Sequence, residues 1–107
     1  MRSRYSAYAL NKANYIIDTT HKESPHYLKN KSEWKKEILV FCKSTQFQNL
    51  EIIDESVPSK TATVTFIASL LQNGHDITFT EKSTFKKLGE KWLYVSGTKK
   101  DGIHFDL

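Results

Sequence analysis

The chain has 107 residues, which is enough for one domain with a substantial core and too short for two. Its formal charge of +4 suggests nucleic-acid binding, but the lysines are mixed with acidic residues along the whole chain, so this partner is not favoured. No apolar run approaches the ~20 residues that span a bilayer. The opening MRSRYSAYAL also lacks the apolar region of a signal peptide, so we expect a soluble, cytoplasmic protein without a membrane partner.

The cysteine and histidine content gives no sign of a metal centre. Cys42 is the only cysteine, so an intrachain disulfide and a paired-cysteine metal motif are both excluded, and a reducing compartment is expected. Cys42 falls on the apolar stripe of a predicted helix, where packing is its expected role. The four histidines lack the spacing of metal ligands among themselves and with Cys42. We therefore predict no metal and no cofactor.

Apolar residues at helical spacing predict helices in the first part of the chain. The first helix covers residues 2–10. Its residues at helical spacing are Tyr5, Tyr8 and Ala9. Asn11 is expected to cap a second helix, which ends near His21. The residues that share one face of this second helix are Ala13, Ile16, Ile17 and Thr20.

A third helix is predicted to begin at Ser32, because a serine hydroxyl suits the N-cap position. Its apolar residues follow the spacing i, i+4, i+7 and i+8, which is typical of a helix packed on a core. These residues are Trp34, Ile38, Phe41 and Cys42.

After Thr45 the period of the apolar residues changes to two, which predicts strands. The expected strands cover residues 47–57, 61–71, 77–85 and 92–98, and a short strand is expected near 104–107. Asn73 and Gly74 predict a type I′ hairpin turn, and Gly89 with Glu90 predicts a second hairpin.

Helices followed by hairpin-linked strands predict an α+β domain over residues 1–107. The helices must cover one face of a single antiparallel sheet, since nothing else is available to bury it. A twisted sheet that curls around the helices leaves a concave side, where a pocket is expected.

Several segments resemble one bacterial family. These segments are RSRYSAYAL with NYIIDTTH, then VTFIAS, EKSTF and KWLYVSG. Together they resemble the middle domain of the YchJ-like, SEC-C motif-containing proteins, over residues 1–97. The resemblance implies a cone-like nuclear transport factor two-like (cystatin-like) fold, with N-terminal helices on a curved antiparallel sheet of four or more strands. That cone is reused by isomerases, cyclases, dehydratases and binding modules, so the fold does not determine the function.

The sequence departs from that family in one respect. Family members usually carry cysteine-rich SEC-C motifs on either side of this domain, and those motifs look like zinc sites. This sequence contains neither motif, so the resemblance carries no zinc site over to it. A naturally short member and an excised domain both fit this pattern.

A polar pair interrupts the apolar face of the predicted strand ITFTEKSTF, residues 77–85. With a period of two, Glu81 and Ser83 lie on the same face as Phe79 and Phe85. A buried carboxylate needs a partner, because an unpaired charge in an apolar environment is costly. In the structural interpretation, Arg4 binds Glu81 through both nitrogens of its fork and fixes the first helix on the sheet. We favour this direct pair.

In the alternative interpretation, Glu81 faces a ligand pocket. It would then bind a small molecule, or act as a general acid or base with His21 or a tyrosine in an isomerase, cyclase or dehydratase type of enzyme. Ser83 would contact a ligand oxygen. The predicted site comprises Arg4, Tyr5, Tyr8, His21, Phe66, Glu81, Ser83, Phe85, Trp92 and Tyr94. Overall function is interpreted as a ligand-binding, accessory or interaction module in preference to an enzyme.

The opposite face of the predicted sheet is rich in threonine and is expected to be exposed. Its residues are Thr61, Thr63, Thr65, Ile67, Thr78, Thr80 and Thr84. A surface of this kind suits sheet-to-sheet packing. The sequence therefore suggests a homodimer through this face, beside a small-molecule ligand as the other partner.

Overall fold

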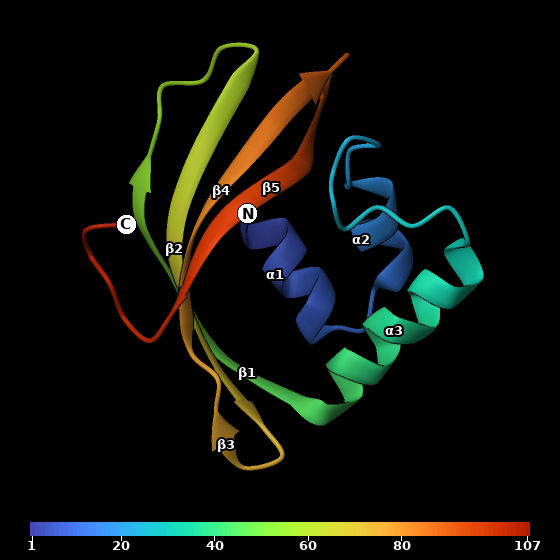
Figure 1. The fold of residues 1–107 in the computed structure, drawn as a ribbon, viewed down its shortest axis with the longest axis vertical. Helices are drawn as coiled ribbons and strands as arrows, with labels where there is room; N and C mark the ends of the chain where they lie inside the picture. Colours follow the sequence, from blue (N-terminus) through green and yellow to red (C-terminus); the bar gives the residue numbers. More distant parts are fainter.

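The computed structural model describes residues 1–107 as three helices on one side of an antiparallel sheet (Figure 1). The helices are α1 (Arg2–Ala9), α2 (Ala13–Asp18) and α3 (Lys31–Ser44). The strands are β1 (Thr45–Glu55), β2 (Thr61–Gln72), β3 (His75–Asp76), β4 (Phe79–Leu88) and β5 (Lys91–Asp101). The order across the sheet is β1-β2-β4-β5, and β3 pairs with the end of β2. The predicted α+β class is confirmed.

The turn between α1 and α2 differs from the prediction. Asn11 has a φ of 58°, in the left-handed region that asparagine tolerates better than most residues, so it forms the turn and does not cap α2. Helix α2 begins at Ala13 without a side-chain cap and ends at Asp18, earlier than expected. The chain beyond α2 instead runs alongside β5, where Thr20 forms a parallel bridge with Tyr94.

The N-cap of helix α3 lies two residues before the predicted one. The side chain of Asn30 accepts a hydrogen bond of 3.1 Å from the backbone N–H of Glu33, so Asn30 is the N-cap and Ser32 lies inside the helix. Both residue types suit this position, and local sequence alone does not decide between them. The predicted apolar stripe is confirmed, with Trp34 and Ile38 buried.

The sheet is bent by irregularities in its pairing. The register of β1 against β2 shifts twice, between Phe47 and Asn49 and between Ile52 and Asp54. The register of β4 against β5 shifts between Thr84 and Phe85. Because a bulge bends the strand that contains it, these shifts curve the long strands around α1, and the helices lie on the concave side (Figure 1).

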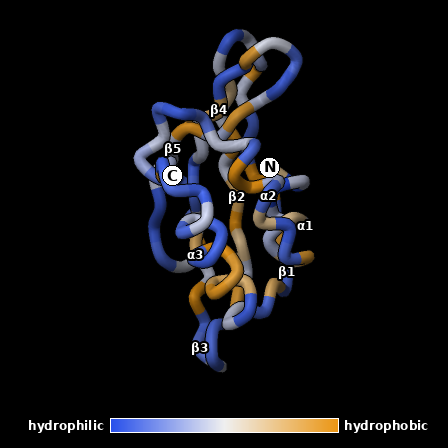
Figure 2. The backbone as a smooth tube through the Cα atoms, turned by 90° about the vertical axis from the view of Figure 1, so that its right-hand side faces the viewer, coloured by the Kyte–Doolittle hydropathy of each residue, from blue (hydrophilic) through white to orange (hydrophobic).

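Both predicted hairpins are present. Asn73 and Gly74 have φ values of 52° and 81°, as both central residues of a type I′ turn require. Gly89 has a φ of 61° in the turn between β4 and β5. The hairpin that contains β3 is hydrophilic, whereas the middle of β2 is hydrophobic (Figure 2). The predicted strand near residues 104–107 was wrong, because β5 ends at Asp101 and no strand follows it.

The C-terminal segment instead packs on the side of the sheet away from the helices (Figure 1). The N–H of Gly102 donates to the carbonyl of Thr78, at 2.8 Å. The hydroxyl of Thr80 donates to the carbonyl of Gly102, also at 2.8 Å, and accepts from the N–H of His104 at 3.0 Å. Thr80 is thereby completely buried.

The outer face of the sheet is consequently less open than the alternating pattern suggested. The prediction of exposure was wrong for Thr65, Ile67 and Thr80, which are buried within a single chain. Thr61 is exposed, while Thr63, Thr78 and Thr84 are half-buried. A period of two indicates which side of a sheet a residue faces, but it does not show what else packs on that side. No observation tests the predicted homodimer.

The buried apolar residues form two clusters. The helical cluster consists of Ala7, Ala13, Ile16, Ile17, Trp34, Ile38 and Cys42. The sheet cluster is centred on Phe66, Ala68 and Leu70 of β2. Burial raises the pKa of the Cys42 thiol, which keeps it protonated within the helical cluster. None of the three helices is long and apolar enough to cross a membrane.

Candidate functional site

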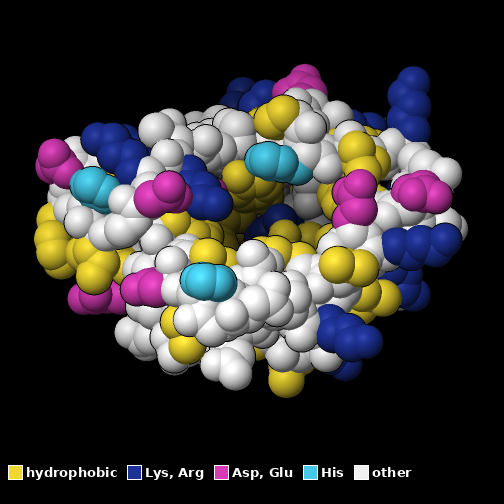
Figure 3. Space-filling model, turned by 60° about the horizontal axis from the view of Figure 1, so that its bottom comes forward, with side chains coloured by type: hydrophobic (Ala, Val, Ile, Leu, Met, Phe, Trp, Pro, Cys, Tyr) yellow, Lys and Arg dark blue, Asp and Glu magenta, His cyan; other side chains and the backbone are white.

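A cavity of about 520 Å³ lies between the helices and the concave face of the sheet, and we call it the cone cavity. Its lining residues are Met1, Arg4, Tyr5, Tyr8, Ile16, Thr20, His26, Trp34, Glu37, Ile38, Phe41, Phe47, Phe66, Ala68, Leu70, Phe79, Glu81, Tyr94 and Lys99. The molecule is visibly hollowed in Figure 3, with hydrophobic side chains along the hollow and a basic side chain deep inside it. Size and apolar lining are typical of small-molecule sites.

Glu81 lies on β4 and faces the helices, as the period-two pattern predicted. It is paired in register with Phe66 on β2 and Lys99 on β5. Its side chain lies against Gly97 of β5, where an added Cβ would be 2.5 Å from Glu81 Oε2. The absence of a side chain at Gly97 therefore makes room for the carboxylate.

Two neutral hydroxyl groups donate hydrogen bonds to the Glu81 carboxylate. The hydroxyl of Ser83 and the hydroxyl of Tyr94 both donate to Oε2, the second at 3.2 Å. Ser83 is 0% exposed, so its hydroxyl serves Glu81 and cannot reach a ligand oxygen. The other oxygen of Glu81, Oε1, accepts no hydrogen bond from the protein and is not sealed from solvent.

Arg4 does not form the predicted pair with Glu81. No basic side chain lies within 4.0 Å of Glu81, and the only ion pair of a lysine or arginine is that of Lys86 with Glu23, so this prediction was wrong. Arg4 Nη1 instead donates to three oxygens at the end of α2 and just beyond it. These are the Ile16 carbonyl at 3.2 Å, Thr19 Oγ1 at 2.7 Å and Thr20 Oγ1 at 3.3 Å. The orphan carbonyls at a helix C-terminus attract a cation, which accounts for this alternative.

Tyr94 connects the two charged residues. The guanidinium of Arg4 lies over its ring, 4.8 Å from the centroid, and its hydroxyl binds Glu81. The backbone N–H of Tyr94 donates to the Thr19 carbonyl, and the N–H of His21 donates to the Tyr94 carbonyl, both at 2.8 Å. Burial and the adjacent Glu81 carboxylate raise the pKa of Tyr94, so the phenol stays protonated and donates.

Tyr94 belongs to the predicted site, but its polar role between Arg4 and Glu81 was not predicted. The available signal was its place on a strand next to the one that carries Glu81. The register shift between Thr84 and Phe85 prevents simple alternation from showing that the two side chains meet. Lys99, whose ammonium lies 4.3 Å from the centroid of the Phe79 ring, was also missed, because the strand that carries it was predicted to end at residue 98.

The other predicted site residues divide between several places. Tyr5, Tyr8 and Phe66 line the cone cavity. Phe85 and Trp92 line a second cavity of about 710 Å³, which also borders Arg4. No group of three histidine, cysteine, aspartate or glutamate side chains could hold a metal ion together.

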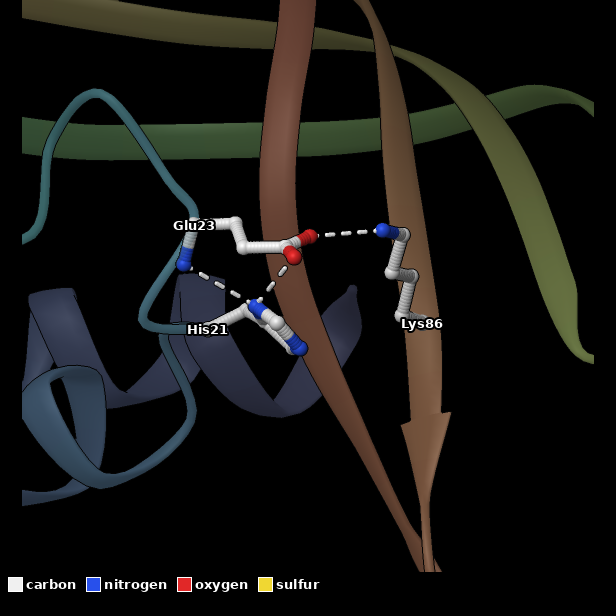
Figure 4. Close-up of polar contacts among 3 residues, drawn as sticks. All are labelled: His21, Glu23 and Lys86. Carbon is white, nitrogen blue, oxygen red and sulfur yellow. Dashed lines mark hydrogen bonds and ion pairs between the residues drawn. The ribbon is translucent and has the colours of Figure 1, made fainter.

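His21 lies outside both cavities. Its Nδ1 accepts a hydrogen bond of 3.0 Å from the backbone N–H of Glu23, and the carboxylate of Glu23 lies 2.7 Å from Nζ of Lys86 (Figure 4). No hydrogen bond or ion pair connects His21 with Glu81. The alternative acid–base pair predicted for these two residues is therefore not formed.

Comparison with known proteins places this geometry in a family. The chain is 31% identical over 101 residues to a UPF0225 protein of Enterobacter sp. (strain 638), covering 92% of this chain and 63% of that protein. It thus spans less than two thirds of the length of that curated relative. A SEC-C motif containing protein from Rhodopseudomonas palustris has a similar solution structure, with a TM-score of 0.76 and 29% identity over 92% of this chain and 73% of that chain.

A crystal structure of a SEC-C motif containing protein from Psychrobacter arcticus is also similar, with a TM-score of 0.68 and 26% identity over 97% of this chain and 60% of that chain. Residues 1–97 match the family model described as the middle NTF2-like domain of YchJ. The cone-like fold and the family that the sequence resembles are both confirmed. The chain belongs to the YchJ family, as its middle, NTF2-like domain.

Proposed function

We propose that this domain binds a small organic molecule in the cone cavity. The observation that carries the proposal is the combination of apolar walls with two oppositely charged side chains, Arg4 and Glu81, that border the same cavity without pairing. Ligand pockets commonly combine apolar walls with a few polar groups that orient the ligand. This arrangement therefore supports a binding role.

The free polar atoms support the same role. In a purely structural network, direct pairing would offset the cost of moving both charges out of water. Here Oε1 of Glu81 accepts no hydrogen bond, and Nη2 and Nε of Arg4 donate to no charged or carbonyl group of the protein. A ligand that supplied complementary groups would offset that cost, and its binding would be favoured accordingly.

An enzyme that uses Glu81 is the second candidate. The predicted acid–base pair of Glu81 with a tyrosine corresponds to the hydrogen bond between Tyr94 and Glu81. The raised pKa of Tyr94 keeps its phenol protonated, so Tyr94 is a poor proton donor and is not present as the phenolate that would act as a base. Its hydroxyl also already donates to Glu81. These properties favour binding over isomerase, cyclase or dehydratase chemistry.

The cytoplasmic location and the homodimer are further parts of this proposal. The lone Cys42 supports a reducing compartment. Thr61, with the half-buried Thr63 and Thr84, leaves part of the outer face of the sheet accessible to a second copy. A monomeric mass in light scattering at high micromolar concentration would contradict the homodimer.

The two tryptophans make the binding proposal directly testable. Trp34 lines the cone cavity and Trp92 lines the second cavity, so each indole N–H reports on one cavity in an ¹H–¹⁵N NMR spectrum. Trp92→Phe assigns the two peaks. Titration with a library of small organic compounds is expected to shift the Trp34 peak and to leave the Trp92 peak in place.

A matched pair of variants controls for indirect effects. Ala68 lines the cone cavity and Ala62 lines the second cavity, and both face the helices from β2. Ala68→Phe is expected to abolish the Trp34 shift by occupying the cone cavity, while Ala62→Phe leaves the shift intact. An unmoved Trp34 peak throughout the library, or equal binding by both variants, would refute the proposal.

A further inference from the structure

We propose that the ligand of the cone cavity is an amino acid or hydroxy acid with an apolar body. Its carboxylate pairs with the free edge of the Arg4 guanidinium, and its ammonium or hydroxyl group donates to Oε1 of Glu81. This inference rests on the proposed function and names the chemical class of the ligand.

The guanidinium of Arg4 is buried and only partly used. Arg4 is 7% exposed, yet its three protein acceptors all bind the same nitrogen, Nη1. The remaining nitrogens, Nη2 and Nε, donate to no carboxylate or carbonyl and are not sealed from solvent, and the neutral Tyr8 hydroxyl lies near the guanidinium. An arginine carries five N–H donors, so an edge of the fork is left for a ligand.

The charge of Arg4 has no counter-ion. No carboxylate lies within 4.0 Å of it, and all of its hydrogen-bond acceptors are neutral. Burial lowers the pKa of Arg4, while Tyr8, Tyr94 and Glu81, which all line the cone cavity, act in the opposite direction. A carboxylate matches a guanidinium fork with two parallel hydrogen bonds and would supply the missing charge.

Glu81 sets a second requirement on the ligand. Its Oε2 already accepts from Ser83 and Tyr94, whereas Oε1 is free. An anion without a hydrogen-bond donor would be repelled by this carboxylate. An ammonium or hydroxyl group elsewhere in the same small molecule would satisfy Oε1 and remove that penalty, so an acid with a nearby donor fits both charges.

The aromatic walls of the cavity indicate the character of the remaining part of the ligand. Phe66 and Phe79 contact each other edge to face, with 6.0 Å between ring centroids, on the sheet side of the cavity. Phe41 and Phe47 form a similar pair, also at 6.0 Å, where α3 meets β1. Aromatic walls of this kind favour an aromatic or aliphatic body over a sugar or a polyanion.

The test uses the wild-type protein and four compounds that share a phenylpropyl skeleton. Phenylalanine carries an acid and an ammonium group, 3-phenyllactate an acid and a hydroxyl, 3-phenylpropionate an acid alone, and phenylalaninamide no acid. Titrations follow the Trp34 indole N–H. The first two compounds are expected to bind at least about tenfold more tightly than the last two, because only they satisfy both Arg4 and Glu81.

Two variants test which protein side chain binds each polar group of the ligand. Arg4→Lys keeps the positive charge and loses the planar fork, so both acids that bind are expected to weaken by about tenfold while phenylalaninamide is unaffected. Glu81→Gln is expected to remove the advantage of phenylalanine and 3-phenyllactate over 3-phenylpropionate. The comparison of ligands on the wild-type protein stands even if Arg4→Lys disturbs the end of α2.

The outcomes separate this inference from the proposed function. Equal binding of phenylalanine and phenylalaninamide at Trp34 would overturn the assignment of Arg4 and leave a neutral-ligand cavity standing. Equal binding of phenylalanine and 3-phenylpropionate would overturn the assignment of Glu81. If neither the four compounds nor the neutral probe phenol moved the Trp34 peak at millimolar concentration, this inference and the proposed cavity function would both fail.

Discussion

Two polar clusters of this domain differ in whether their opposite charges are in direct contact. The outer cluster, His21, Glu23 and Lys86, holds opposite charges in direct contact, with 2.7 Å between Lys86 Nζ and Glu23 Oε2 (Figure 4). The inner cluster consists of Arg4, Glu81, Ser83 and Tyr94. It keeps its two charges apart and connects them through the ring and hydroxyl of one tyrosine.

The contrast shows that a direct ion pair does not imply a large contribution to the free energy of unfolding. The side chain of Glu23 is 64% exposed, so water and salt screen its ion pair and little stability depends on it. The inner cluster has no ion pair, but its hydroxyl groups are buried and losing one leaves a carboxylate poorly solvated. Unpaired charge is also the basis of the proposed ligand site in the inner cluster.

The largest effect is expected for Gly97→Ala. The new Cβ would displace the Glu81 carboxylate from both of its hydroxyl donors, which should lower the free energy of unfolding by about 3 kcal/mol. Urea denaturation measures the change. In a Glu81→Ala background the same substitution should cost less than about 1 kcal/mol, because the clash is gone. An equal loss of unfolding free energy in both backgrounds would show that the effect of Gly97→Ala does not come from displacement of the Glu81 carboxylate.

Ser83→Ala is expected to lower the free energy of unfolding by about 2 kcal/mol, because it removes a donor to a carboxylate at a fully buried position. Ser69→Ala on β2 is the matched control, since the side chain of Ser69 makes no hydrogen bond and should change stability by less than about 0.5 kcal/mol. Similar losses for the two variants would contradict a special role of the inner cluster.

Tyr94→Phe keeps the ring over which Arg4 lies and removes the hydroxyl that binds Glu81, so we expect a loss of about 1–2 kcal/mol at pH 8. The pKa of Tyr94 is raised in the folded state from an ordinary value of 10.0. The corresponding stability is complete below pH 10 and is lost as the pH rises above it. The difference between the wild type and Tyr94→Phe should therefore shrink between pH 8 and pH 11, and a constant difference would contradict this assignment.

The smallest effect is expected for Lys86→Ala in the outer cluster. The hydrogen bond from Lys86 lowers the pKa of the Glu23 carboxyl below its ordinary value of 4.5, so the pair can contribute only above that pH and loses its contribution as the pH falls through the folded-state pKa. Because Glu23 is exposed, we expect no measurable change in Tm at physiological salt. A clear drop in Tm would show that the outer cluster also contributes substantially to stability and would contradict the contrast between the two clusters.

The order of the elements and the inward polar pair could be read from the sequence. Asn73 and Gly74 form the predicted turn, and Glu81 and Ser83 face the helices, because hairpin turns and the period of a strand are local properties. The partner of Glu81 could not be read in the same way. Arg4 lies in the first turn of α1, and which group it meets depends on where α2 ends and how β5 runs past it.

The sequence by itself determined the fold class, the family and the presence of a carboxylate on the concave side of the sheet, because periodicity and turn chemistry act over a few residues. Only the tertiary structure decided that Tyr94 stands between Arg4 and Glu81 and that the C-terminal segment covers Thr80. Bulges shift the strand register, and long-range packing selects among chemically equivalent partners. Those choices depend on contacts between residues far apart in the chain, which no local pattern records.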